Sequence, residues 1–244
     1  MPTVKLHANK YEELIRRRGR VVKWQEAITC SCINLDSGQP VYDCQACKGR
    51  GYTLADPIED VVLLMSVTHN AEFAEMAGMF EIGDAVMTVG ARVPNINPKT
   101  GVVDNKNPGR HNPIFHCGMY DLITLTDDEY KTSEVLIKGT PIYAREADTL
   151  LNEDVLDVTH VRKSDPMTGD ITVYEKDIDY TWDGNRIVWL GVKEPYDGEQ
   201  YTVQYIHRPV FVILKQLPTP RYQDGQDLPK KVMVRYRAGG FDRP

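Results

Sequence analysis

The chain has 244 residues, 41% of them hydrophobic, and a formal net charge of −6. This length favours more than one domain, and the acidic balance argues against specific nucleic-acid binding. No apolar run approaches the ~20 residues of a membrane span, and the N-terminus lacks the apolar core of a signal peptide. We therefore expect a chain that folds inside the cell, with reduced thiols and without a membrane partner.

The first predicted element is a helix over residues 8–18. Asn9 can cap its start and Gly19 can end it. Helical spacing places four side chains on one face: Tyr11, Leu14, Ile15 and Arg18. The basic segment Arg16–Arg20 is typical of a solvated helix end, where cations favour the dipole. A strand over 21–28 follows and leads into a cysteine-rich loop.

Four cysteines in this loop form two close pairs, Cys30-Ser31-Cys32 and, eleven residues later, Cys44-Gln45-Ala46-Cys47. Two close pairs separated by a hairpin-sized loop have the spacing of a four-sulfur zinc site. The turn-forming segment Asp36–Pro40 lets the chain double back between them. Because all four nearby candidate ligands are cysteines, the sequence predicts a closed, structural zinc site with Cys30, Cys32, Cys44 and Cys47 as its ligands.

The same cysteines leave two other interpretations open. They could form two disulfides, or Cys44-x-x-Cys47 alone could act as a redox dithiol. Gly49 and Gly51 are expected to let backbone amides approach the sulfurs of the second pair. The fifth cysteine, Cys117, lies in the apolar stretch Ile114–Met119 and is expected to be a buried small hydrophobe.

Strand patterns dominate residues 53–145, the first predicted β domain. Apolar runs predict strands at five places: 61–67, 80–89, 114–119, 122–125 and 134–137. Residues 94–113 are rich in Asn, Pro and Gly and have no periodicity. A loop of this length inside a compact domain is usually functional or ordered by a partner. We expect this loop and the basic segment Arg16–Arg20 to form subunit contacts, since arginine is favoured in interfaces.

Residues 146–244 are predicted to form a second β domain. Its predicted strands are 155–161, 170–174, 180–182, 186–190, 201–206, 210–214 and 232–236. Asp183-Gly184, flanked by aromatic and aliphatic residues, is a strong hairpin signal. An aromatic cluster could form a cross-strand core or a platform for a sugar or peptide; its members are Tyr180, Trp182, Trp189, Tyr196, Tyr201 and Tyr205.

The predicted fold class is therefore mainly β. It comprises an N-terminal helix and zinc knuckle in residues 1–52, a β-barrel or sandwich in 53–145, and a second β-sandwich-like domain in 146–244. Strands do not alternate with ten-residue helices, so no parallel sheet is expected. The sequence contains no Gly-rich phosphate loop, no H-E-x-x-H and no G-x-S-x-G. We expect the chain not to be an enzyme.

Three segments resemble structural proteins of tailed bacteriophages, in the region that joins capsid to tail. The first is the cysteine couplet followed by Cys44-Gln45-Ala46-Cys47-Lys48-Gly49-Arg50-Gly51-Tyr52; the others are Phe80–Val89 and Asn185–Pro209. The resemblance implies a homo-oligomeric ring without catalysis that binds neighbouring head, neck or tail proteins. It also implies a place in the virion, after assembly in the host cytoplasm.

Two further functions stay open at the level of sequence. The pattern Cys-x-x-Cys-x-Gly-x-Gly also resembles the cysteine-rich region of J-domain chaperones, which suggests a zinc-dependent chaperone-like or redox protein. Those regions carry several copies of the pattern, whereas this chain has one. A glycan-binding tail protein that uses the aromatic cluster is the other alternative.

Overall fold

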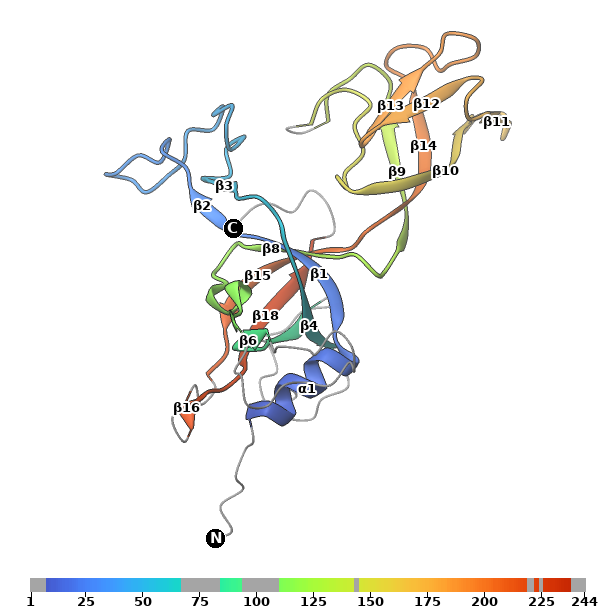
Figure 1. The fold of residues 1–244 in the computed structure, drawn as a ribbon. Helices are drawn as coiled ribbons and strands as arrows, with labels where there is room; N and C mark the ends of the chain where they lie inside the picture. Colours follow the sequence, from blue (N-terminus) through green and yellow to red (C-terminus); the bar gives the residue numbers. More distant parts are fainter. Residues whose placement is uncertain are drawn as a thin grey trace. The chain divides into compact units, whose positions relative to one another are not determined.

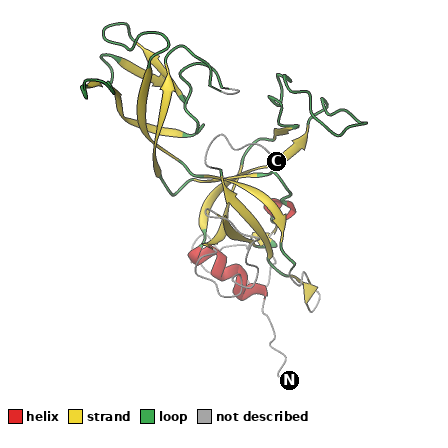
Figure 2. Cartoon of the chain, turned by 180° about the vertical axis from the view of Figure 1, so that it is seen from behind, coloured by secondary structure: helices red, strands yellow, loops and turns green. Residues whose placement is uncertain are grey.

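The computed structural model describes residues 8–66, 84–93, 110–142, 145–218, 222–223 and 226–237. The chain divides into two compact units (Figure 1). The barrel unit combines the chain up to Asp127 with the returning segment Val210–Arg237, and the second unit is built from Asp128–Pro209. The predicted mainly β fold with one N-terminal helix is confirmed (Figure 2).

Six strands of the barrel unit close into a barrel in which all neighbours are antiparallel. Around the barrel they follow the order β1 (Arg20–Gln25), β4 (Ile58–Ser66), β5 (Asp84–Val89), β18 (Lys230–Tyr236), β15 (Val210–Gln216) and β8 (Leu122–Leu125). The ring closes because β1 pairs with both β4 and β8. Closure removes the exposed edges that an open sheet would present.

Alternating side chains of these strands fill the barrel core. The buried residues include Val22, Met87, Ile123, Ile213 and Val234, all with essentially no exposed surface. Each comes from a different strand, so the core depends on pairings between distant parts of the sequence. Cys117 belongs to this cluster, as predicted for a small hydrophobe.

The predicted N-terminal helix, α1 (Ala8–Arg18), packs against β4. Ile15 is the buried residue of its inner face. The Glu12 carboxylate accepts hydrogen bonds from the backbone amides of Ala91 (2.7 Å) and Arg92 (3.3 Å). The chain then turns at Gly19, where an added Cβ would lie only 2.8 Å from the carbonyl oxygen of Val62.

Shorter elements complete the barrel unit. They are β2 (Ala27–Thr29), β3 (Tyr52–Leu54), β6 (Arg92–Val93), β7 (Arg110–His111), the 3-10 helix η2 (Pro113–His116), β16 (Tyr222–Gln223) and β17 (Gln226–Asp227). The strand predicted at 114–119 is wrong, since η2 occupies its first half. The Asn112 side chain caps η2 by accepting a hydrogen bond from the Ile114 amide, and Pro113 is the first residue of η2. A capping Asn followed by Pro favours a helical turn. Most of the predicted loop at 94–113 lies outside the described residues.

The second unit contains a four-stranded antiparallel sheet and a hairpin. The sheet order is β11 (Ile171–Tyr174), β10 (Val155–Ser164), β14 (Gln200–His207) and β9 (Tyr130–Ile137). The hairpin of β12 (Tyr180–Asp183) and β13 (Arg186–Trp189) confirms the turn predicted at Asp183-Gly184. Gly184 has a φ of 59°, which a glycine adopts without strain.

Aromatic side chains hold the sheet and the hairpin together in one core. Tyr180, Tyr201 and Tyr205 are at most 1% exposed. The Trp189 ring meets the rings of Tyr174 and Tyr201 edge-on, with both centroid distances at 5.1 Å. Most of the predicted aromatic cluster is therefore cross-strand core, and its most exposed member is Tyr196.

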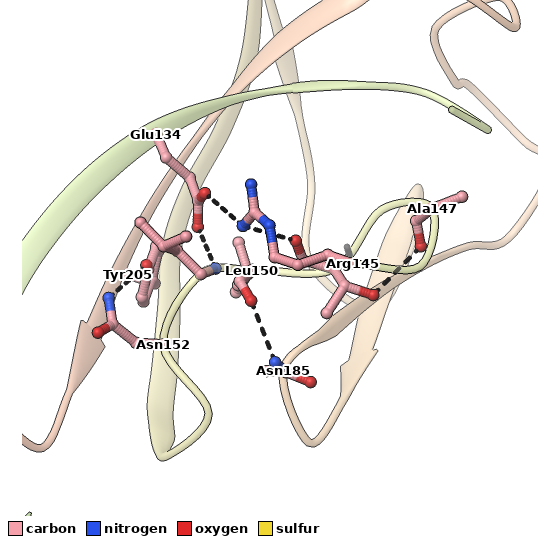
Figure 3. A network of polar contacts seen from close by, with 9 residues as sticks. Glu134, Arg145, Ala147, Leu150, Asn152, Asn185 and Tyr205 are labelled. Atoms are coloured by element: carbon pink, nitrogen blue, oxygen red, sulfur yellow. Dashed lines mark hydrogen bonds and ion pairs between the residues drawn. The ribbon is translucent and has the colours of Figure 1, made fainter. Parts of the chain in front are cut away.

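A polar network fixes the connection between β9 and β10 to this core (Figure 3). Glu134 accepts hydrogen bonds from Arg145 Nη1 (3.0 Å) and from the Leu151 amide (2.8 Å). Asn185, in the hairpin turn, donates to the Leu150 carbonyl at 3.1 Å. Asn152 donates to the Tyr205 hydroxyl at 2.8 Å. The connection is thus tied to both the sheet and the hairpin.

The division into units differs from the predicted boundaries. The prediction placed residues 146–244 in the second domain, but β15 and β18 return to the barrel, and the second unit already begins at Asp128. The physical reason is that β8 and β5 need these late strands as partners to close the barrel.

The described residues contain no helix long and apolar enough to cross a membrane.

Candidate metal centre

The four cysteines lie in one loop, residues 30–51, which we call the metal loop. Strands β2 and β3 pair at its base, with Thr29 opposite Tyr52. The Cys30 amide extends this ladder by donating to the Gly51 carbonyl at 2.8 Å. The first and last turns of the loop are therefore held side by side, which brings the two cysteine pairs together.

Tight turns set the direction of each pair. After the first pair, the Asn34 side chain accepts hydrogen bonds from the amides of Asp36 (2.8 Å) and Ser37 (3.1 Å). Around the second pair, the Lys48 amide donates to the Cys44 carbonyl at 2.7 Å, and the Arg50 amide donates to the Cys47 carbonyl at 3.1 Å.

The sulfur atoms form one compact cluster. The Sγ atoms of Cys30, Cys32, Cys44 and Cys47 all lie within 4.8 Å of one another. Cys30 and Cys44 are 3.9 Å apart and Cys32 and Cys47 are 3.4 Å apart, so each contact joins one residue of each pair. A tetrahedral ion with bonds of about 2.3 Å holds its sulfurs about 3.8 Å apart. These spacings fit four thiolates around one metal ion.

The spacings do not match disulfide bonds, which join sulfurs at about 2.05 Å. All five cysteines are free thiols in the structure. Cys117 is separate from the cluster and lies in the barrel core. The four predicted ligand residues are therefore brought together, and the fifth cysteine is not.

A backbone amide points at one of the sulfurs, as expected from the glycines after the second pair. The Gly51 amide donates to Cys47 Sγ at 3.4 Å. The φ values of Gly49 (79°) and Gly51 (82°) lie in the left-handed region. At Gly49 a Cβ would also come within 2.7 Å of the Tyr42 carbonyl oxygen. Glycine is needed there for both conformation and space.

The pKa values of two of the four thiols are shifted in opposite directions. Burial disfavours the Cys47 thiolate, but the Gly51 amide and the neighbouring thiols outweigh it and lower the pKa of Cys47 to about 6. Burial, together with hydrogen bonds to the other three thiols, raises the pKa of Cys32 to about 12. A divalent cation favours thiolates and displaces such protons on binding.

Asp121 ties the metal loop to the barrel. This carboxylate is 1% exposed. It accepts hydrogen bonds from Trp24 Nε1 (2.8 Å), from the Ala27 amide at the start of β2 (2.8 Å) and from the Gly118 amide (2.7 Å). The sequence carries no local signal for this role, because Asp121 lies 97 and 94 positions from its first two partners.

Aromatic stacking adds a second anchor at the base of the metal loop. The rings of Tyr52 and Tyr120 lie 5.7 Å apart and 15° from parallel. The Arg50 guanidinium lies 5.8 Å from the centroid of the Tyr52 ring, and its Nε donates to the Cys47 carbonyl. The loop is thereby held on the barrel next to its cysteine cluster.

The donor set is chemically uniform. Four thiolates are the ligands of closed structural zinc sites, which leave no open position for a reacting molecule. Soft sulfur ligands also suit copper(I) and iron–sulfur clusters, so the cluster could hold a metal ion but does not select one particular metal. Comparison of the sequence with protein-family models and with curated proteins found no match.

Proposed function

We propose that the metal loop binds one structural Zn²⁺ through Cys30, Cys32, Cys44 and Cys47. The all-cysteine donor set and the sulfur spacings of 3.4 and 3.9 Å support this proposal. The metal replaces the apolar core that the loop lacks, because only Cys30, Cys47 and Gly51 are buried within it. When bound, zinc cross-links two turns that hydrogen bonds alone hold weakly.

On this basis the chain acts as a structural component of a tailed-phage virion. It is a ring-forming neck, connector or tail-joining protein that works through contacts with its own copies and with neighbouring head, neck or tail proteins. The observation that carries the proposal is the four-thiol cluster in the motif running from Cys30 to Tyr52, mounted on a small β-barrel through Asp121. That motif is one of the three segments that resemble such phage proteins.

The observed geometry supports the two alternative functions less well than it supports this proposal. Tyr180, Tyr201 and Tyr205 are buried in the core of the second unit, so their faces are not available to a glycan. Cys44 and Cys47 each contact a cysteine of the other pair, which suits one shared metal better than an independent dithiol.

The virion role is tested by proteomics and imaging of purified particles of the phage that encodes the chain. We expect stoichiometric amounts of the chain in the particles and its density at the neck or the tail. Particles that are complete and infectious without the chain would contradict the proposal. A purified chain that turns over a defined substrate would contradict the non-catalytic role.

A further inference from the structure

The metal loop presents large apolar side chains to solvent. Leu35 is 98% exposed and Tyr42 is 90% exposed. An exposed carboxylate follows each of them, at Asp36 and Asp43. Among the described residues, no ion pair involves either carboxylate. A loop without its own core that displays two apolar anchors beside two acids has the character of an interaction surface.

The loop becomes more acidic when the metal is bound. Its charged side chains are Asp36, Asp43, Lys48 and Arg50, which balance one another. Four thiolates around one divalent ion add net negative charge. Arg50 is already engaged with the Tyr52 ring and the Cys47 carbonyl. A surface that binds the metal-bound loop should therefore be apolar and basic.

The outer face of α1 has this complementary character. Tyr11 and Leu14 are 39% and 40% exposed, and helical spacing places Arg18 in the same stripe. Lys10 is also exposed, and within the described part of the chain neither it nor Arg18 forms an ion pair. Arg17, by contrast, pairs with Glu13 at 2.7 Å. The stripe thus offers two apolar side chains and two available cations.

The two surfaces lie at opposite ends of one strand. Helix α1 ends just before β1, and the metal loop follows directly after β1 through β2. At about 3.3 Å per residue, the six residues of β1 separate them by about 20 Å. Both belong to the barrel unit, and Figure 1 shows them at opposite ends of β1, so a contact between them needs a second copy of the chain.

We propose that the metal loop of one copy docks on the outer face of α1 of the next copy. Leu35 and Tyr42 pack against Tyr11 and Leu14, while the two carboxylates pair with Lys10 and Arg18. A contact between two different surfaces of the same chain is head-to-tail and generates a ring when the rotation closes. This inference rests on the proposed assembly role and names the surfaces that perform it.

The test reverses the charges on each surface separately and then together, in the zinc-loaded full chain. We expect Asp36→Lys with Asp43→Lys to weaken self-association about tenfold or more in sedimentation experiments at low salt. We expect Lys10→Glu with Arg18→Glu to do the same. Combining all four substitutions in one chain should restore association. The matched control, Glu146→Lys with Glu153→Lys in the second unit, should leave it unchanged.

Three outcomes overturn this inference. They are a wild-type chain that stays monomeric up to about 100 μM, charge-reversed variants that associate like the wild type, and a combined variant that does not recover. Metal content and circular dichroism show that each variant is loaded and folded. The virion experiment above is independent, so a chain found in particles keeps its structural role even if this contact is wrong.

Discussion

The metal loop and the second unit hold irregular chain segments in place by different means. In the metal loop, residues 30–51 bury almost no apolar surface, and four thiols converge instead. In the second unit, the connection from Arg145 to Asn152 rests on an aromatic core and a hydrogen-bond network. The proposed metal would therefore take the place of burial in a loop that has no core of its own.

The comparison also predicts different sensitivities. A metal-held loop depends on a few ligands, each of which is indispensable. A core-held segment distributes its stability over many contacts, each of moderate size. Substitutions in the two regions should therefore affect different measurements.

The largest effect is expected from Cys44→Ser. Structural zinc contributes on the order of 10 kcal/mol of binding free energy, so losing one ligand should empty the site and unfold the metal loop. Limited proteolysis should then cut within 30–51, while residues 128–209 stay protected. The matched control is Cys117→Ala, which should keep the metal because Cys117 lies in the barrel core. A Cys44→Ser loop as resistant as the parent's would show that the site is not structural.

Leu136→Ala tests the second region. Leu136 is 1% exposed in the core of the second unit, and such truncations typically cost about 2–5 kcal/mol. We expect the free energy of unfolding of this unit to fall by that amount, with the metal content unchanged. Leu190→Ala, at a side chain 45% exposed, is the control and should have little effect. Loss of metal from Leu136→Ala would mean that the two regions are not independent.

Asp121→Asn probes the junction between the metal loop and the barrel. The amide keeps the side-chain volume. With its oxygen toward Trp24 and Gly118, which keeps two of the three bonds, its NH2 group faces the Ala27 amide, which loses its acceptor at a cost of about 1–3 kcal/mol. Hydrogen exchange of the Ala27 amide should accelerate while the metal stays bound. Asp56→Asn, at an exposed carboxylate, should leave this exchange rate unchanged. An unaltered Ala27 amide in Asp121→Asn would contradict the anchoring role.

The smallest expected effect is the change in stability of the second unit with pH. Burial lowers the pKa of His207, against the opposing influence of the Arg208 carbonyl. The neutral ring fits its contacts, with Nε2 3.1 Å from the Thr132 hydroxyl and Nδ1 3.0 Å from the Arg208 carbonyl oxygen. As pH falls from 7 through about 6.5, the unfolded chain takes up a proton before the folded chain does. The free energy of unfolding of the second unit should therefore decrease.

His207→Gln should reduce this pH dependence between pH 7 and 5, measured by denaturant unfolding. The exposed His160 provides the control, since His160→Gln should keep the slope of the wild type. Equal slopes in all three proteins would exclude His207 as the titrating group.

Local patterns predicted the features whose causes are local. The helix over residues 8–18, the hairpin at Asp183-Gly184 and the clustering of four cysteines each follow from spacing within a short segment. The strand predicted at 114–119 failed because Asn112 and Pro113 favour a helical turn.

Features set by distant pairings were not predictable in this way. The sequence gives no sign that β15 and β18 return to the barrel, because their apolar runs do not specify which strands they pair with. Asp121 was missed for the same reason, since two of its donors, the Trp24 indole and the Ala27 amide, are adjacent to it only after the barrel closes.

The central claim is that one metal ion, bound by four thiolates, replaces a core in the metal loop. It is tested most directly by elemental analysis combined with X-ray absorption spectroscopy of protein purified from zinc-replete cells. We predict about one zinc per chain with four sulfur neighbours at about 2.3 Å. A metal-free protein whose Cys30, Cys32, Cys44 and Cys47 are joined in two disulfides would contradict the claim.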